Sequence, residues 1–144
     1  MNPETSTILV VDDNPMTARW VGRMIESLGY GAVLEFDGEG ALNRLAEGQF
    51  VAVISDVEMP RMNGFELVQN IHLRCPEMPV VLMAASSGAD CVESARAWGA
   101  WALLEKPVNS DQLAGLVGMA KRPLQTIKGL HLLATPQEAS SGLS

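Results

Sequence analysis

The stretch "VISDVEMPRMNG", which runs from Val53 to Gly64, places an aspartate directly at the end of an apolar run. Burying a charged group away from water is costly, so the position of Asp56 needs a physical reason. One reason is structural, because aspartate often occupies the turn that follows a strand. The other is chemical, because a carboxylate at the edge of a sheet is available to react. The rest of the chain decides between the two.

Apolar runs typical of strands alternate with helical patterns along the chain on both sides of this stretch. The strand-like runs cover residues 7–13, 31–36, 50–56, 79–85 and 101–105, and the helical patterns cover residues 14–30, 38–48, 64–74, 89–99 and 109–122. The strands are apolar throughout, which is typical of parallel strands that are covered on both faces. The pattern therefore predicts an α/β fold, a doubly wound five-stranded parallel sheet with five helices.

The composition narrows the classes of function. The chain has 144 residues, the size of one domain, and a formal net charge of -7. An acidic surface repels nucleic-acid phosphates, so we expect no direct nucleic-acid binding. No run approaches the roughly 18 apolar residues of a membrane span, and the first seven residues do not resemble a signal peptide. We therefore expect a cytoplasmic protein, in which Cys75 and Cys91 remain reduced.

Charged side chains follow three of the predicted strands. The first strand ends in Asp12 and Asp13, the third ends in Asp56, and the fifth is followed by Lys106. The carboxyl ends of parallel strands meet at one edge of the sheet, so these groups should lie together. Three clustered carboxylates repel one another, and Mg²⁺ relieves that repulsion. Together with Lys106, the Mg²⁺ ion would neutralise the charge of a phosphoryl group transferred to Asp56. The modified Asp56 would be an aspartyl phosphate.

Each of these residues alone also has a structural explanation as a cap, a loop pair or a turn. Their combination on three strands of one sheet favours a functional site. The chain resembles the receiver domain of two-component response regulators and of hybrid sensor kinases over about residues 7–121. The resemblance rests on the motifs "ILVVDDNP", "VISDVEMPRMNG", "MPVVLMAA" and "EKP", and on the pair Gly99 and Ala100.

The resemblance implies the flavodoxin-like strand order 2-1-3-4-5 and a role for each charged residue. Asp56 would be phosphorylated by a histidine kinase or a phosphotransfer protein, in a domain that is not itself an enzyme. Asp13 and Asp56 would bind Mg²⁺ through their side chains, Asp12 largely through water, and Glu58 through its backbone carbonyl. Lys106 would pair with the phosphoryl oxygens, and its bond to the following proline would be cis.

Two positions depart from the pattern of this family. Ala84 stands where the family normally has serine or threonine, and Leu103 stands where it often has tyrosine or phenylalanine. The missing hydroxyl removes one hydrogen bond to a charged oxygen, worth about 1.5–3 kcal/mol. An alternative is therefore a pseudo-receiver, a protein-interaction module with impaired switching. A third hypothesis is a phosphatase of the haloacid dehalogenase type, but that class has D-x-D where this chain has adjacent Asp12 and Asp13.

We expect residues 1–122 to form the receiver domain and residues 123–144 to form a tail. Within the tail, Leu124, Ile127, Leu130 and Leu133 recur at steps of three, which indicates a short helix that packs on the domain or links it to another module. Receivers commonly meet partners through the face of the fourth helix, fifth strand and fifth helix, so we expect a dimer or an output partner there. Trp98 and Trp101 belong to this flank, either in the core or at the interface.

Overall fold

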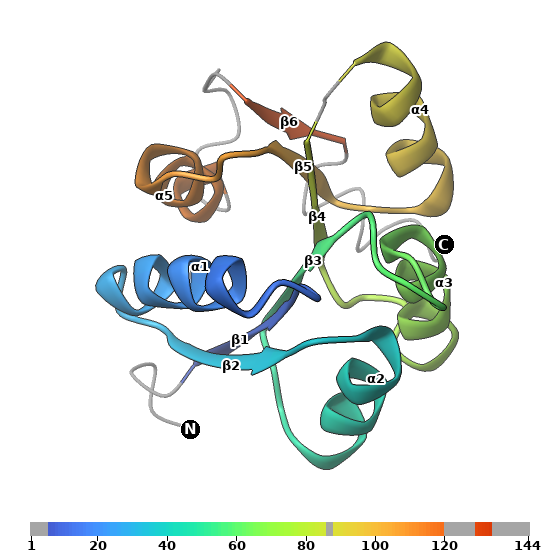
Figure 1. The fold of residues 1–144 in the computed structure, drawn as a ribbon, viewed down its shortest axis with the longest axis horizontal. Helices are drawn as coiled ribbons and strands as arrows, with labels where there is room; N and C mark the ends of the chain where they lie inside the picture. Colours follow the sequence, from blue (N-terminus) through green and yellow to red (C-terminus); the bar gives the residue numbers. More distant parts are fainter. Residues whose placement is uncertain (1–5, 86–87, 120–128, 134–144) are drawn as a thin grey trace.

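The computed structural model describes residues 6–85, 88–119 and 129–133, and it has the predicted alternation of strands and helices (Figure 1). The strands are β1 (Thr7–Val11), β2 (Gly31–Glu35), β3 (Ala52–Asp56), β4 (Val80–Ala84), β5 (Ala102–Glu105) and β6 (Leu130–Leu132). The helices are α1 (Pro15–Ser27), α2 (Gly38–Glu47), α3 (Gly64–Arg74), α4 (Ala89–Trp98) and α5 (Ser110–Met119). The predicted α/β class is confirmed.

The sheet has the strand order β2-β1-β3-β4-β5-β6. Strands β1 to β5 pair in parallel, which confirms the predicted order 2-1-3-4-5. The sixth strand was not predicted, and β6 lies antiparallel to β5 at the edge of the sheet (Figure 1). The helix expected from the spacing of leucines is therefore wrong at Leu130, which forms part of this strand. Leu124, Ile127 and the predicted boundary at 122/123 lie outside the described residues.

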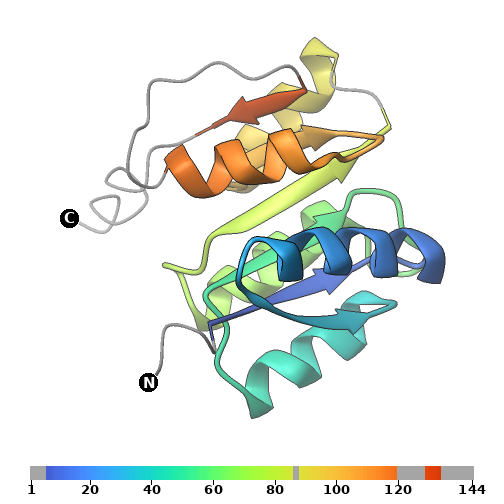
Figure 2. The same ribbon diagram turned by 90° about the vertical axis from the view of Figure 1, so that its left-hand side faces the viewer.

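Helices cover both faces of the sheet, as a doubly wound fold requires (Figure 2). On one face α1 and α5 pack on Val10, Ile54 and Leu104, and on the other α2, α3 and α4 pack on Leu9 and Leu103. All five of these strand side chains are buried, which explains why the strands are apolar throughout instead of alternating.

Capping residues fix where the helices begin after the carboxyl ends of the strands. Asn14 accepts hydrogen bonds from the backbone N–H groups of Met16 and Thr17 at the start of α1. Asn63 and Glu66 form a reciprocal capping box at the start of α3. These caps end the loops that follow β1 and β3, so both loops leave the same edge of the sheet in a fixed direction.

Candidate functional site

The acidic side chains that the sequence places at strand ends lie together in the structure. Asp12 follows β1 and has no exposed surface, whereas Asp56 ends β3 with 6% of its surface exposed. Asp13 is exposed beside them, and one carboxylate oxygen from each of the three residues lies within 4.8 Å of the others. Among the described residues this is the one cluster of potential metal ligands of its kind. Hard divalent cations such as Mg²⁺ take carboxylate oxygens of this type, so the donor set fits that ion.

The loop after Asp56 is held tightly against the end of β3. The backbone N–H of Glu58 donates to Oδ1 of Asp56 over 3.3 Å, and the N–H of Gly64 donates to the carbonyl of Val57 over 2.8 Å. A Cβ atom on Gly64 would collide with the carbonyl oxygen of Asp56 and lie 2.8 Å from the Cα of Val57. Only glycine fits this close approach of two backbone segments. Gly64 therefore closes the loop that presents Asp56.

Lys106 reaches the carboxylates from the end of β5. Its Nζ lies 3.1 Å from Oδ2 of Asp56 and 3.4 Å from Oδ2 of Asp12. Its backbone N–H donates to the carbonyl of Ala84 over 2.8 Å, which ties the position of the lysine to the end of β4. The bond between Lys106 and Pro107 is cis. One ammonium group thus bridges the carboxylates of two strands.

The charges in this cluster are strongly coupled. Burial raises the pKa of Asp12, and the negative charge of Asp56 raises it further, against the lowering effects of its hydrogen bond with Asn14 and of Lys106. For Lys106, burial favours the neutral amine, but the hydrogen bond and charge of Asp56 outweigh it and raise the pKa. The lysine is therefore a fixed positive charge at neutral pH. The carboxylates still outnumber it, which leaves room for a further cation.

The two departures from the expected motif lie on the neighbouring strands. Ala84 ends β4 and is 6% exposed, and Leu103 in β5 is fully buried. Neither side chain offers a hydroxyl group, and Ser86 and Ser87 lie outside the described residues. The region beside Asp56 that would contact a bound group therefore has an apolar wall at β4.

The tryptophans of this flank have different environments. Trp98 is 39% exposed at the end of α4 and stacks on Phe65 of α3, with ring centroids 6.1 Å apart. Trp101 is half-buried and packs on the core cluster that α1 and α5 cover, and its Nε1 is buried without a hydrogen-bond partner among the described residues. Trp101 thus belongs to the core, and Trp98 lies at the surface.

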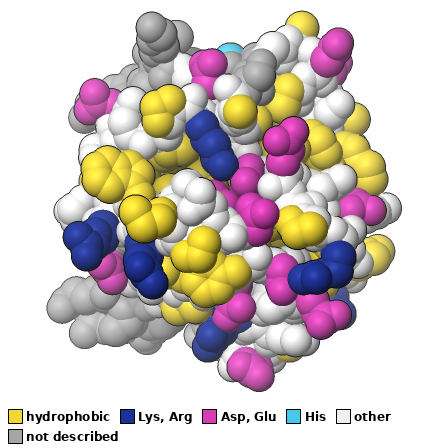
Figure 3. Space-filling view, viewed as in Figure 1, with side chains coloured by type: hydrophobic (Ala, Val, Ile, Leu, Met, Phe, Trp, Pro, Cys, Tyr) yellow, Lys and Arg dark blue, Asp and Glu magenta, His cyan; other side chains and the backbone are white. Residues whose placement is uncertain are grey.

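A feature that sequence reasoning missed is a groove beside Lys106. It is lined by residues of α1, of the loop after β5 and of the position directly after β4, namely Met16, Thr17, Trp20, Val21, Lys106, Pro107, Val108 and Ala85. Met16 is 73% exposed and Trp20 is 60% exposed, with the indole N–H of Trp20 donating to the carbonyl of Val108. In Figure 3 hydrophobic side chains surround the central acidic and basic groups on this face. The signal that could have indicated this groove was the pair Met16 and Trp20, two large apolar side chains that lie on the outer face of α1.

Comparison with known proteins places this chain in a family. The sequence profile of the response regulator receiver domain matches residues 8–117. The chain belongs to this family. Receiver domains are generally phosphoacceptors without enzymatic activity of their own, and they bind Mg²⁺ at an acidic pocket. The match therefore identifies a domain of two-component signal transduction and gives no support to the pseudo-receiver alternative.

Individual relatives agree with this assignment. The chain is 40% identical over 110 residues to the sensor histidine kinase RcsC of Salmonella typhi, covering 74% of this chain and 11% of the relative. It is 32% identical to the nitrogen assimilation regulatory protein NtrX of Azorhizobium caulinodans, covering 84% of this chain and 26% of the relative. The chemotaxis protein CheY4 of Vibrio cholerae has a similar structure, with a TM-score of 0.74, 28% identity, and coverage of 78% and 96% of the two chains.

The chain spans only 11% and 26% of the lengths of these two curated relatives. Within the described residues, every helix is too short or too polar to cross a lipid bilayer.

Proposed function

We propose that this chain accepts a phosphoryl group on Asp56 from a phosphohistidine of a histidine kinase or phosphotransfer protein, with Mg²⁺ bound. The observation that carries this proposal is the placement of Lys106 Nζ 3.1 Å from the Asp56 carboxylate, within a group of three acids at one edge of the sheet. A nucleophile beside fixed positive charge is the arrangement that phosphoryl transfer requires.

In the proposed step, a carboxylate oxygen of Asp56 attacks the phosphorus of the donor. The new O–P bond forms as the P–N bond breaks, and the electron pair of that bond returns to the imidazole nitrogen. Lys106 donates hydrogen bonds to the phosphoryl oxygens and balances their charge. Asp12, Asp13 and Asp56 would hold Mg²⁺ together with the Glu58 carbonyl, and bound Mg²⁺ would supply further positive charge for the transfer. Hydrolysis later returns the free carboxylate and inorganic phosphate.

The groove over α1 suits the protein that delivers the phosphoryl group. A donor must bring its histidine in line with Asp56, and the exposed Met16 and Trp20 lie beside Lys106 on that approach. Apolar and aromatic side chains of this kind are enriched at protein interfaces. We therefore propose that the donor docks here and that the reaction takes place in the cytoplasm, where the free thiols of Cys75 and Cys91 remain reduced.

Phosphorylation by a small donor tests the chemistry directly. The chain is incubated with phosphoramidate, which has the P–N bond of phosphohistidine, and Mg²⁺, and its intact mass is followed. We expect one phosphoryl group per chain, and none in Asp56→Asn or in the wild type with a chelator. A phosphorylated Asp56→Asn variant would contradict the assignment of the site.

A separate comparison tests the docking groove. Trp20→Ala should slow transfer from a phosphorylated histidine kinase but leave the reaction with phosphoramidate unchanged, because the small donor needs no docking surface. If the wild type and Trp20→Ala accepted the phosphoryl group from the kinase at equal rates, the groove would not be the docking site of the donor.

A further inference from the structure

The sixth strand ties the C-terminal part of the chain to the phosphoacceptor site. We propose that the outer edge of β5 is a strand-docking surface, that residues 129–133 are its occupant, and that the phosphorylation state of Asp56 controls the occupancy. This inference rests on the proposed function, since it gives that site an output within the same chain.

Residues 129–133 are held on β5 by contacts along their whole length. Three residue pairs form the antiparallel ladder, with Leu103 opposite His131 at its centre. Beyond the ladder, the N–H of Glu105 donates to the carbonyl of Gly129 over 2.7 Å, and the N–H of Leu133 donates to the carbonyl of Trp101 over 2.9 Å. This short ladder is a small unit, and such edge strands dissociate more easily than central ones.

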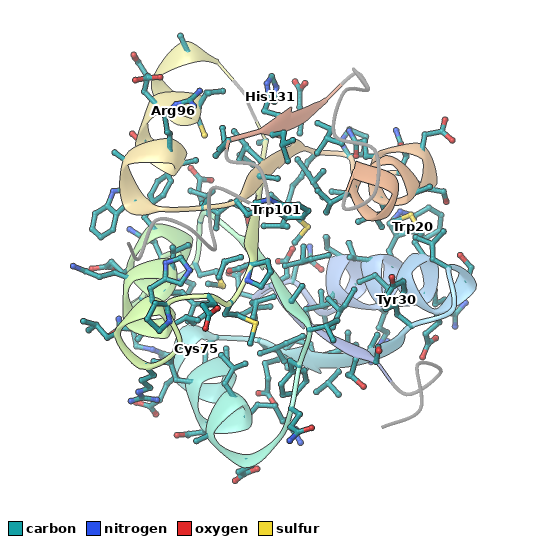
Figure 4. The ribbon with its side chains drawn as sticks, turned by 180° about the vertical axis from the view of Figure 1, so that it is seen from behind. Trp20, Tyr30, Cys75, Arg96, Trp101 and His131 are labelled. Carbon is teal, nitrogen blue, oxygen red and sulfur yellow. The ribbon has the colours of Figure 1, made fainter. Side chains whose placement is uncertain are left out.

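Side chains from both faces of the sheet complete the docking surface. Leu130 is buried with the core beneath α5, and Leu133 is buried with the core beneath α4. Arg96 of α4 donates from its Nη1 to the carbonyl of Leu133 over 3.3 Å, and Figure 4 shows Arg96 and His131 near the same edge of the sheet. The indole N–H of Trp101 is buried without a partner among the described residues, in the cluster that Leu130 completes. Undocking the strand opens this cluster to water, which satisfies that N–H and offsets part of the cost.

The junction between the strand and the site is a set of three residues. Glu105 immediately precedes Lys106, and its N–H bonds to Gly129 while its carbonyl accepts from Nε2 of Gln112 over 3.2 Å. Gly129 has a φ of +81°, and a Cβ atom there would collide with Nε2 of Gln112. Gln112 is 4% exposed and is itself fixed by a capping box with Asn109. Gly129 therefore lies closely against Gln112 of α5, so a displacement of β5 relative to α5 would disturb the hydrogen bond between Glu105 and Gly129.

Phosphorylation acts on this junction through Lys106. A phosphoryl group carries more negative charge than the carboxylate it replaces and attracts the ammonium group that now bridges Asp12 and Asp56. A shift of Lys106 toward it draws Glu105 away from Gly129 and lengthens the hydrogen bond that begins the ladder. Ala84 and Leu103 provide neither a hydroxyl nor an aromatic ring, so the response that we propose passes through the backbone of Lys106 and Glu105.

Amide hydrogen exchange, read by mass spectrometry, tests the inference on the full chain. The chain is compared with and without acetyl phosphate in Mg²⁺, and its intact mass is recorded on the same samples. We expect the amides of Glu105 and Leu133 to exchange at least about tenfold faster in the phosphorylated chain, because strand release removes their acceptors. Failure to gain a phosphoryl group would overturn the proposed function and this inference together. A phosphoryl group with unchanged exchange would overturn this inference alone.

Two glycine variants separate the junction from general destabilisation. Gly129→Ala should give the fast exchange of β6 without phosphate, because alanine is strained at this φ and collides with Gln112. Gly29→Ala is the matched control, since Gly29 has a φ of +96° and no atom within 4 Å of a new Cβ. Arg96→Gln removes the donor to Leu133 together with an exposed ion pair to Glu93. It should produce the same acceleration more weakly, and it replaces Gly129→Ala if that variant does not fold. Slow exchange in both Gly129→Ala and Arg96→Gln, or equal acceleration in Gly29→Ala, would overturn the proposal.

Discussion

At the ends of β1 and β3 the chain carries Asp12 and Asp56, whereas at the end of β4 and within β5 it carries Ala84 and Leu103. We call the first region, with Lys106 and Asp13, the acceptor side, and the second, with α4 and β6, the readout side. The acceptor side has every charged group that the family motif implies. On the readout side, positions 84 and 103 carry neither a hydroxyl group nor an aromatic ring, and the sheet has an additional strand. In the proposed account, accepting a phosphoryl group and responding to it share Lys106 but otherwise depend on different residues, which substitutions can separate.

The largest effect should come from removing the cation of the acceptor side. Lys106→Met should slow phosphorylation by acetyl phosphate about 10²-fold, since a positioned donor to a charged transition state contributes about that much. The rate is measured by intact mass over time. Arg61→Met is the control, because Arg61 is a surface cation whose guanidinium pairs with Asp37 over 3.3 Å. Equal slowing in both variants would indicate a general effect of charge and not a role for Lys106.

The metal site should also belong to the acceptor side alone. Mg²⁺ at 100 times its Kd should stabilise the wild type by about 2.7 kcal/mol, because it binds the folded state. Asp13→Asn should lose most of this gain, whereas Glu47→Gln, which removes an exposed acid on α2, should keep it. Thermal unfolding with and without Mg²⁺ measures both. If Asp13→Asn kept the full gain, the ion would bind elsewhere.

A substitution on the readout side sharpens the comparison. In a Trp20→Phe, Trp101→Phe background the fluorescence reports Trp98, which stacks on Phe65. Beryllofluoride should change this signal little in that background and more after adding Ala84→Thr, because the new hydroxyl contributes about 1.5–3 kcal/mol of charged hydrogen bonding. Ala85→Thr, one residue further along, should have no such effect. A large change without Ala84→Thr, unaltered by adding it, would show that α4 responds by another route.

The smallest effect concerns the buried carboxylate of Asp12. Burial and the charge of Asp56 raise its pKa above the ordinary 3.8, so between the two values the folded chain binds more protons than the unfolded chain. Stability from this group therefore falls as the pH rises through that interval. Asp12→Asn removes the titration, so in metal-free buffer its stability relative to the wild type should grow as the pH rises from 3.8 toward neutrality. Urea unfolding measures the difference, and a constant difference would contradict the coupling.

The acceptor side could be predicted from the sequence because short local patterns indicate its residues. Asp12 and Asp56 each end an apolar run, and the parallel topology brings such ends together without further knowledge. The need for glycine at position 64 was not predicted, because it follows from the approach of two backbone segments. The sequence could place the residue in a loop but could not show what a Cβ atom there would meet.

The readout side could be predicted less well because its contacts are distant in the sequence. Leu130 and Leu133 recur at a spacing that also suits a helix, and a strand of three residues is too short to show an alternating pattern. The contact of Gln112 with Glu105 and Gly129 depends on the antiparallel register of β6 on β5. This strand pairing depends on tertiary contacts, and no local sequence pattern specifies it.

Chemical trapping of the phosphorylated residue tests the central claim most directly. Borohydride reduces an acyl phosphate to an alcohol, so phosphorylated aspartate is converted to homoserine, and peptide sequencing then gives its position. After treatment with acetyl phosphate and Mg²⁺, we predict homoserine at position 56 and unmodified aspartate at positions 12 and 13. Homoserine at Asp12 or Asp13, or no reduction at any position, would contradict the assignment of Asp56 as the phosphoacceptor.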